Sequence, residues 1–192
     1  MYDRSMPNVS LEMRAKLTGE IPVWEAPAPY SVRFFSAGED GDWARIQTSA
    51  EEFACEEDAL KRGFGNSFKP DYLLLDGRMF FAVDENDVPV GTTSAWFDGD
   101  IGMLHWVGVH ADHQGKGLAR PMISAALRRM QEFGYKKAML HTQPPSWVAI
   151  RLYLEFGFKP VWPKDEKTLE GWKAVYAKLG KEFSKEECAD WD

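Results

Sequence analysis

The sequence predicts a single α/β domain of the α+β type, in which a mixed, mostly antiparallel sheet is flanked by helices. Three strand-like segments separated by short turns follow one another between residues 78 and 110, which is typical of an antiparallel meander. Beyond residue 115, amphipathic helices alternate with short apolar strands. A chain of 192 residues, of which 44% are hydrophobic, is long enough to bury one core.

Residues 1–29 are expected to be an N-terminal extension. Prolines punctuate this segment, and only SLEMRAKL, residues 10–17, has helical character. The opening residues lack the order of basic and then apolar residues that marks a signal peptide, and no apolar run reaches the roughly 20 residues that cross a bilayer. A cytoplasmic protein without a membrane partner is therefore expected.

The domain is expected to cover residues 30–165. Its first strand is predicted at residues 30–37, and Asp40 or Asp42 can cap a helix that runs to Ala54. The elements predicted after it are a helix at 56–63, strands at 78–84, 88–97 and 101–110, a helix at 116–134, a strand at 136–142, a helix at 146–156 and a strand at 158–162. A C-terminal helical extension follows at residues 166–192, with helical spacing over 168–179.

The composition argues against several classes of partner. The chain carries 23 basic and 30 acidic residues, a net charge of −7. Nucleic-acid binding needs a basic face, so DNA and RNA are not expected as partners, and a cationic acceptor is weakly favoured. Cys55 and Cys188 lack a partner motif, and the histidines lack metal-ligand spacing on a helix. No metal and no disulfide are expected.

The junction ADHQGKGLA, residues 111–119, lies between the last strand of the meander and the long helix. The first backbone N–H groups of a helix lack an intrahelical acceptor, and with the helix dipole behind them they suit a phosphate group. Glycine lets such a ligand approach the backbone. The junction matches neither the Walker nucleotide-binding loop nor the GxGxxG dinucleotide-binding fingerprint. A ligand with a diphosphate group, outside these two classes of nucleotide site, therefore remains. The cradle would consist of Gln114, Gly115, Lys116, Gly117, Leu118 and Ala119.

Two motifs carry a family resemblance. VGVHADHQGKGLA resembles motif A of the GNAT-type N-acetyltransferases, whose signature of Gln or Arg, two residues, Gly, one residue, and Gly or Ala is met by Gln114, Gly117 and Ala119. AIRLYLEFGF resembles the family's motif B, with Leu152, Tyr153, Gly157 and Phe158 in the expected places. Ser146 stands where motif B often has Asn, and the helical residues 163–192 lack the seventh strand that commonly ends the family's fold. The resemblance implies the GNAT acyl-CoA N-acyltransferase fold.

The resemblance also implies acetyl-CoA as the co-substrate, with its diphosphate in the cradle. Its pantetheine arm would pair with the strand Val107, Gly108 and Val109, where GNAT proteins splay two parallel strands at a bulge, and a free N–H there can stabilise the thioester oxyanion. Lys116 and Arg120 lie four residues apart on one side of the helix and can add positive charge near the phosphates. Alternatively, both are ordinary solvated side chains.

Direct attack on the thioester requires a neutral amine, and an alkylamine with a pKa near 10.4 is only about one part in 2,500 neutral at pH 7. His105 is the first candidate for the base, because simple alternation places it on the face of Val107 and Val109. The alternative is a histidine hydrogen-bonded at the sheet surface. By resemblance, Tyr153 would protonate the leaving CoA thiolate, against the alternative of a plain core tyrosine.

The sequence leaves the acceptor and part of the function open. The leading hypothesis is an acetyltransferase acting on a primary amine of a small molecule or peptide, and the alternative is an acyl-CoA-binding sensor without catalysis. A longer acyl donor or a hydroxyl acceptor is also compatible with the residues. An aromatic acceptor pocket around Trp96, Trp106 or Trp147 competes with core packing of these side chains. Exposed strands and the terminal segments are compatible with a homodimer.

Overall fold

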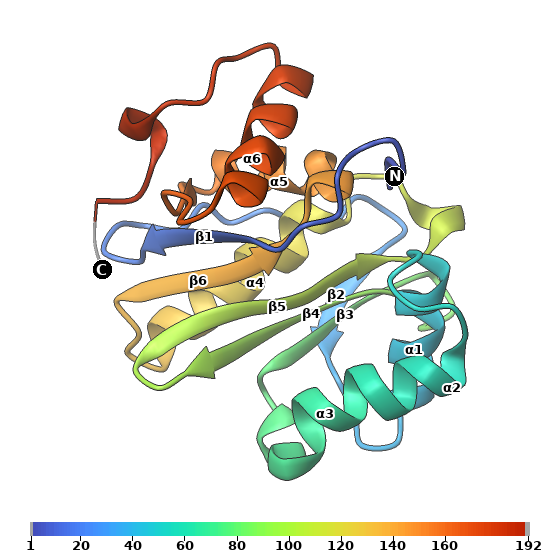
Figure 1. Cartoon of the computed structure of the whole chain (residues 1–192). Coiled ribbons are helices and arrows are strands. Elements are labelled where there is room, and N and C mark those ends of the chain that lie inside the picture. Colours follow the sequence, from blue (N-terminus) through green and yellow to red (C-terminus); the bar gives the residue numbers. More distant parts are fainter. Residues whose placement is uncertain (1, 191–192) are drawn as a thin grey trace. The chain divides into compact units, whose positions relative to one another are not determined.

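The computed structural model describes residues 2–190, which form two compact units (Figure 1). One unit comprises Glu20–Tyr135, and the other combines the segment up to Gly19 with the segment from Lys136 onward. No helix among the described residues is both long enough and apolar enough to cross a membrane. The domain boundaries that we predict at residues 30 and 165 stay predictions.

The unit Glu20–Tyr135 contains the expected meander. Its four strands, β2 (Ser31–Phe34), β3 (Met79–Val83), β4 (Pro89–Asp98) and β5 (Ile101–Val109), pair antiparallel in chain order. Asp98 pairs with Ile101 across the β4–β5 hairpin, and Gly99 in its turn has a left-handed φ of 57°. The predicted positions of all four strands are confirmed, because turn residues and β-branched or aromatic runs alternate so regularly here.

Helices cover both faces of this meander (Figure 1). A Cβ added to Gly108 would meet Gln47 of α1, whereas one added to Gly102 would meet Met130 of α4. The helical elements on the α1 side are α1 (Asp40–Ser49), α2 (Glu56–Asp58), the π-helical turn Ala59–Phe64, α3 (Gly65–Phe68) and the 3-10 segment Lys69–Leu75. The other face carries α4 (Ala119–Glu132) alone. The prediction that α1 continues to residue 54 is wrong, because Glu51 adopts a φ of 67°.

An aromatic core lies between the α1 side and the sheet. Trp43, Phe64 and Phe68 of the helical elements are at most 1% exposed. Phe68 contacts the ring of Trp96 edge-on, with centroids 5.1 Å apart. Trp106 packs against the same cluster, so the packing alternative for Trp96 and Trp106 fits the structure better than an aromatic acceptor pocket.

The second unit is built around an N-terminal strand. Its strand β1 (Leu11–Lys16) pairs antiparallel with β6 (Lys137–Thr142) on one side and with β7 (Lys159–Pro160) on the other. The helical character that we predict for residues 10–17 is therefore wrong. Leu11, Met13 and Ala15 are buried in strict alternation. This period of two favours a strand, although the residue types of the segment individually favour a helix.

The helices of this unit follow the predictions closely. They are the 3-10 turn Pro144–Ser146, α5 (Trp147–Glu155), α6 (Glu166–Lys178) and the 3-10 turn Lys185–Glu187. Asp165 caps α6, because its carboxylate accepts a hydrogen bond of 2.9 Å from the backbone N–H of Thr168, and this bond lowers the pKa of Asp165. Trp172 and Tyr176 bury the inner face of α6. The C-terminal segment contributes no strand among its described residues, and β1 completes the sheet of this unit instead.

Candidate functional site

The junction between β5 and α4 is an open turn with two left-handed glycines. Gly115 has a φ of 74° and Gly117 a φ of 82°, values that residues with a side chain rarely adopt. The side chain of Gln114 donates a hydrogen bond of 3.1 Å from Nε2 to the carbonyl of Val109. This hydrogen bond connects the turn with the C-terminal end of β5. Residues 114–117 are exposed, so the turn faces solvent.

The backbone N–H groups of this turn are available as donors. No side chain caps α4 at Leu118, and no acceptor bonds the N–H groups of residues 115–118 within the described part of the chain. Pro121, in the first turn of α4, has no N–H group. A Cβ added to Gly117 would meet only the ring of Pro27, at 3.9 Å. The turn is therefore an accessible row of N–H donors at a positive helix end, which suits a diphosphate.

Basic and aromatic side chains lie near these donors. Our prediction that Lys116 and Arg120 share one side of the helix is wrong, because α4 begins at Ala119 and Lys116 lies in the turn before it. Lys116 places its Nζ 5.8 Å from the ring centroid of Tyr30, and the Tyr30 hydroxyl lies 3.1 Å from Nδ1 of His113. The guanidinium of Arg120 lies 5.6 Å from the ring of Trp24. Burial, followed by the charges of Lys116 and His110, lowers the pKa of His113, so the folded protein favours the neutral ring.

The pKa of His113 leads to a prediction about acid stability. Because folding lowers this pKa, the contribution of neutral His113 is present above its unfolded pKa of about 6.5 and is lost as the pH falls through the folded value. We expect the melting temperature to fall more between pH 7.5 and pH 5.5 in the natural protein than in His113→Asn, at constant ionic strength. Equal falls in the two proteins would contradict this assignment.

A β-bulge interrupts β5 just before the segment that the resemblance assigns to pantetheine. Thr92 pairs with Gly108 but Ser94 pairs with His105, so Trp106 and Val107 together oppose one residue of β4. Trp106 has a φ of 52°. The bulge expected from the resemblance is thus present in β5.

The bulge reverses the alternation of side chains along β5. The ring of His105 lies 5.8 Å from that of Phe68 on the α1 side, whereas Val109 packs with Leu118 and Met122 on the α4 side. Our prediction that His105 shares a face with Val109 is therefore wrong, because one extra residue moves every later side chain to the opposite face. His105 shares its face with Gly108 instead.

Gln47 of α1 holds this bulge in place. Its side chain is fully buried and donates a hydrogen bond of 3.0 Å from Nε2 to the carbonyl of Trp106. The indole of Trp106 donates in turn to Oγ of Ser67, at 2.9 Å. Sequence reasoning missed Gln47, although a polar residue in the buried stripe of α1, beside Trp43 and Ile46, was the available signal.

Removal of Gln47 should loosen the bulge. We expect Gln47→Ala to lower the free energy of unfolding by about 1–3 kcal/mol, because the Trp106 carbonyl loses a donor in a water-poor place. Urea denaturation measures this change. Thr92→Val is the matched control, since the Thr92 hydroxyl is buried without a partner in the described structure and its removal should be close to neutral. An equal loss of unfolding free energy in both variants would contradict the role of Gln47 in stabilising the bulge.

Tyr153 belongs to the second unit and lies in α5. It is 6% exposed, and its ring packs edge-on against Phe158 with centroids 6.2 Å apart. The backbone N–H of Phe158 donates to the carbonyl of Tyr153 at 3.0 Å, and Gly157 reverses the chain with a φ of 82°. Gly157 and Phe158 of motif B therefore end α5 and hold the ring of Tyr153. The catalytic role of the hydroxyl stays a prediction.

The described residues hold no group of three side chains suited to a metal ion. Cys55 is an exposed free thiol, and Cys188 is a buried free thiol whose pKa burial raises to about 11. A thiol with such a raised pKa is a poor nucleophile at neutral pH.

The fold and the two sequence motifs agree with the class of acyltransferases that the motifs resemble. The chain belongs to the acetyltransferase (GNAT) family, because the model of that family matches residues 42–158, which is more than half of the chain. It is therefore a member of a family of acetyl-transferring enzymes, and the resemblance seen in motifs A and B is confirmed.

Curated relatives carry the name mycothiol acetyltransferase. The protein of that name from Acidothermus cellulolyticus is 30% identical over 168 residues, which cover 79% of this chain and 51% of the relative. The one from Streptomyces coelicolor is 26% identical over 151 residues, covering 77% and 48%. The chain thus spans about half the length of the curated relatives it matches.

Solved structures support the fold. A GCN5-related N-acetyltransferase from Sphaerobacter thermophilus aligns with a TM-score of 0.58 at 17% identity, covering 90% of this chain and 47% of that one. A GNAT-family acetyltransferase from Novosphingobium aromaticivorans aligns with a TM-score of 0.55 at 16% identity, covering 80% and 62%. The predicted fold class is confirmed.

Proposed function

We propose that this protein transfers the acetyl group of acetyl-CoA to a primary amine by direct attack, without a covalent enzyme intermediate. The observation that carries this proposal is the exposed row of unpartnered N–H groups at residues 115–118 in a member of this family. In the reaction, the amine nitrogen forms a bond to the thioester carbonyl carbon and the bond from that carbon to sulfur breaks. The amine loses a proton and the CoA thiolate gains one.

The chain offers residues for binding the co-substrate. The N–H groups from Gly115 to Ala119 would hold the diphosphate, with the exposed Lys116 and the half-buried Arg120 adding positive charge. The backbone of Val107–Val109 would hold the pantetheine arm, and a backbone N–H at the bulge would stabilise the oxyanion. Gly108 suits this role, because it presents no side chain to the ligand.

Two side chains would handle the protons. His105 is the proposed base for the acceptor amine, on the same face of β5 as Gly108. Tyr153 is the proposed acid that protonates the departing thiolate.

The acceptor and the cellular setting are also proposals. We propose an acceptor of the mycothiol type ahead of antibiotics, polyamines, amino acids and protein N-termini, and the name of the curated relatives supports this order. We propose a cytoplasmic location and, because β2 is an exposed edge strand, a homodimer.

A panel assay tests the function. Each amine is mixed with acetyl-CoA and the protein, and the release of free thiol is followed. We expect release above the hydrolysis background with at least one amine, whereas no release with any amine, together with tight CoA binding, would favour the sensor. The packing of His105 against Phe68 is the observation that keeps the sensor in consideration, since this ring contact also suits a histidine with a purely structural role.

A further inference from the structure

Three consecutive residues of β4 carry buried hydroxyl groups. Thr92, Thr93 and Ser94 are each 0% exposed, and none of their hydroxyls has a hydrogen-bond partner within residues 2–190. Buried polar groups in folded proteins are nearly always hydrogen-bonded, because burial without a partner is unfavourable. Apolar side chains of similar size would fill the same space without this cost. The three hydroxyls are therefore candidates for a role beyond packing.

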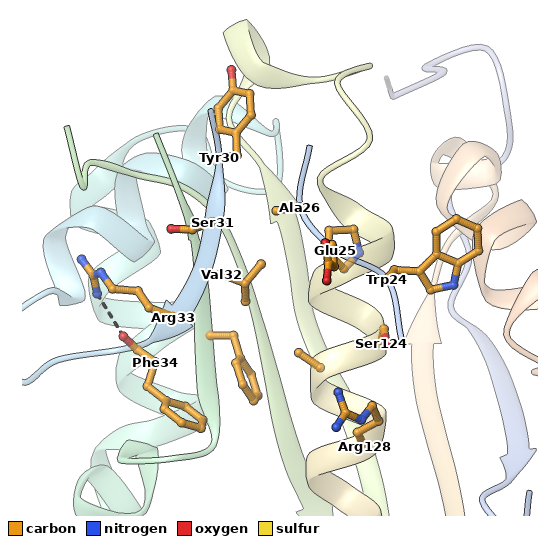
Figure 2. Close-up of a pocket in the computed structure, with 13 residues that line it drawn as sticks. Trp24, Glu25, Ala26, Tyr30, Ser31, Val32, Arg33, Phe34, Ser124 and Arg128 are labelled. Atoms are coloured by element: carbon orange, nitrogen blue, oxygen red, sulfur yellow. Dashed lines mark hydrogen bonds between the residues drawn. The ribbon is translucent and has the colours of Figure 1, made fainter. Parts of the chain in front are cut away.

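The alternation of side chains along β4 places these hydroxyls on two faces of the sheet. Thr93 pairs with Phe80 of β3, and Phe80 lines a cavity of about 430 Å³ between β2 and α4 (Figure 2). Ser94 pairs with Met79, which belongs to the aromatic core on the α1 side. Because opposite residues of an antiparallel pair point to the same face, Thr93 lies on the α4 face and Ser94 on the α1 face.

Ser94 faces the proposed base. It lies directly opposite His105 in the pairing of β4 with β5. The Cβ atoms of such opposite residues are about 4.5–5.5 Å apart, so rotation of the side chains brings the hydroxyl and the imidazole within hydrogen-bonding distance. The other two neighbours of the ring are Phe68 and Trp106, with centroids 5.8 and 5.3 Å away. The Phe68 side chain has no polar atom, and the Trp106 indole N–H already donates to Ser67. Of these three neighbours, Ser94 is therefore the one whose side chain can bond the imidazole.

We propose that Ser94 is a positioning residue, whose hydroxyl oxygen accepts a hydrogen bond from one imidazole nitrogen of His105 while the other nitrogen takes the proton of the acceptor amine. This inference rests on the proposed function, in which His105 is the base. A neutral imidazole has one N–H group and one nitrogen with a lone pair, and the hydrogen bond of the N–H group decides which nitrogen accepts the proton. The same bond strengthens when the ring becomes an imidazolium ion, so it also stabilises the charge that forms as the amine attacks.

NMR spectroscopy of nitrogen-labelled histidine rings tests this contact without turnover. At about pH 8.5 an ordinary imidazole is neutral, and the chemical shifts of its two nitrogens report which one carries the proton. We expect Ser94→Ala to change the ratio of the two His105 tautomers roughly fivefold. The matched control is Thr93→Val, which removes an equally buried hydroxyl from the α4 face and should leave the ratio unchanged. Thermal denaturation checks that both variants are folded, which we expect because each loses a buried hydroxyl that has no partner in the described part of the chain.

Steady-state kinetics tests the role of Ser94 in the reaction. With the best amine of the panel, we expect Ser94→Ala to lower kcat roughly tenfold or more and to leave the affinity for acetyl-CoA unchanged. His105→Ala should lower kcat further. Adding Ser94→Ala to His105→Ala should then change kcat little, because Ser94 acts through the imidazole. Thr93→Val should keep the kcat of the natural protein.

The outcomes separate this inference from the proposed function. An unchanged tautomer ratio or an unchanged kcat in Ser94→Ala would overturn the positioning role, while the natural protein would still transfer acetyl groups. An equal loss of kcat from Ser94→Ala in the presence and in the absence of His105 would overturn it in the same way. A natural protein that releases no thiol with any amine would overturn the proposed function and the positioning role together, even where the tautomer ratio responds to Ser94→Ala.

Discussion

Replacing Gly117 with Val is expected to weaken acetyl-CoA binding by roughly a hundredfold or more, equivalent to the loss of about two charge-assisted hydrogen bonds. The valine side chain would stand in front of the free N–H groups, where the protein leaves open space bounded only by Pro27. It would also resist the left-handed φ of 82° that the turn requires. Isothermal titration with acetyl-CoA measures the effect.

The control for this variant lies at the other end of the same helix. Gly134 has a φ of 88° and nothing within 4 Å of an added Cβ, so Gly134→Val imposes similar backbone strain far along α4 from the turn. We expect the two variants to lose similar stability on denaturation. Only Gly117→Val should lose affinity for acetyl-CoA. Comparable losses in the two variants would show that backbone strain, rather than a blocked row of N–H donors, weakens binding.

Tyr153→Phe is expected to lower the turnover number by roughly a hundredfold or more while leaving the affinity for acetyl-CoA nearly unchanged. The phenylalanine ring keeps the contact with Phe158, so the variant removes the hydroxyl and little else. Steady-state kinetics with the best amine of the panel, together with titration of acetyl-CoA, separates turnover from binding.

Tyr176→Phe provides the comparison for Tyr153→Phe. Tyr176 is also a buried tyrosine of the same unit, and burial raises the pKa of its hydroxyl, but it lies on α6 outside motif B. We expect this variant to keep normal turnover. If Tyr153→Phe turns over as fast as Tyr176→Phe, then Tyr153 is a core tyrosine and another group protonates the thiolate.

Local sequence signals predict most of the elements that carry the site. The meander follows from turn residues between strand-like runs, and α4 follows from an apolar stripe that ends before Gly134. The open turn at residues 114–119 is predictable as well, because two glycines before an uncapped helix leave few alternatives. These features depend on contacts between residues close in the chain.

Non-local contacts explain the features that could not be predicted from the sequence. Strand β1 forms because residues more than 100 positions later supply β6 and β7 as its partners. The bulge at Trp106 depends on Gln47, which lies 59 residues earlier in the chain, and the bulge reverses the expected relation between the faces of His105 and Val109. Local periodicity cannot reveal either arrangement, since both are decided by the packing of distant segments.

Residues 22–30 show the same limit, because the sequence predicts only an extension without secondary structure there. Residues 22–30 have no helical or strand-like period, yet Trp24 and Tyr30 lie against cations of the α4 region. Prolines stiffen such a segment and lower the entropy that it loses on ordering.

A crystal structure of the protein with acetyl-CoA tests the central claim most directly. The account predicts that diphosphate oxygens accept hydrogen bonds of about 3 Å from the backbone N–H groups of the turn between Gly115 and Ala119. A coenzyme bound with its diphosphate elsewhere, while these N–H groups face solvent, would contradict it.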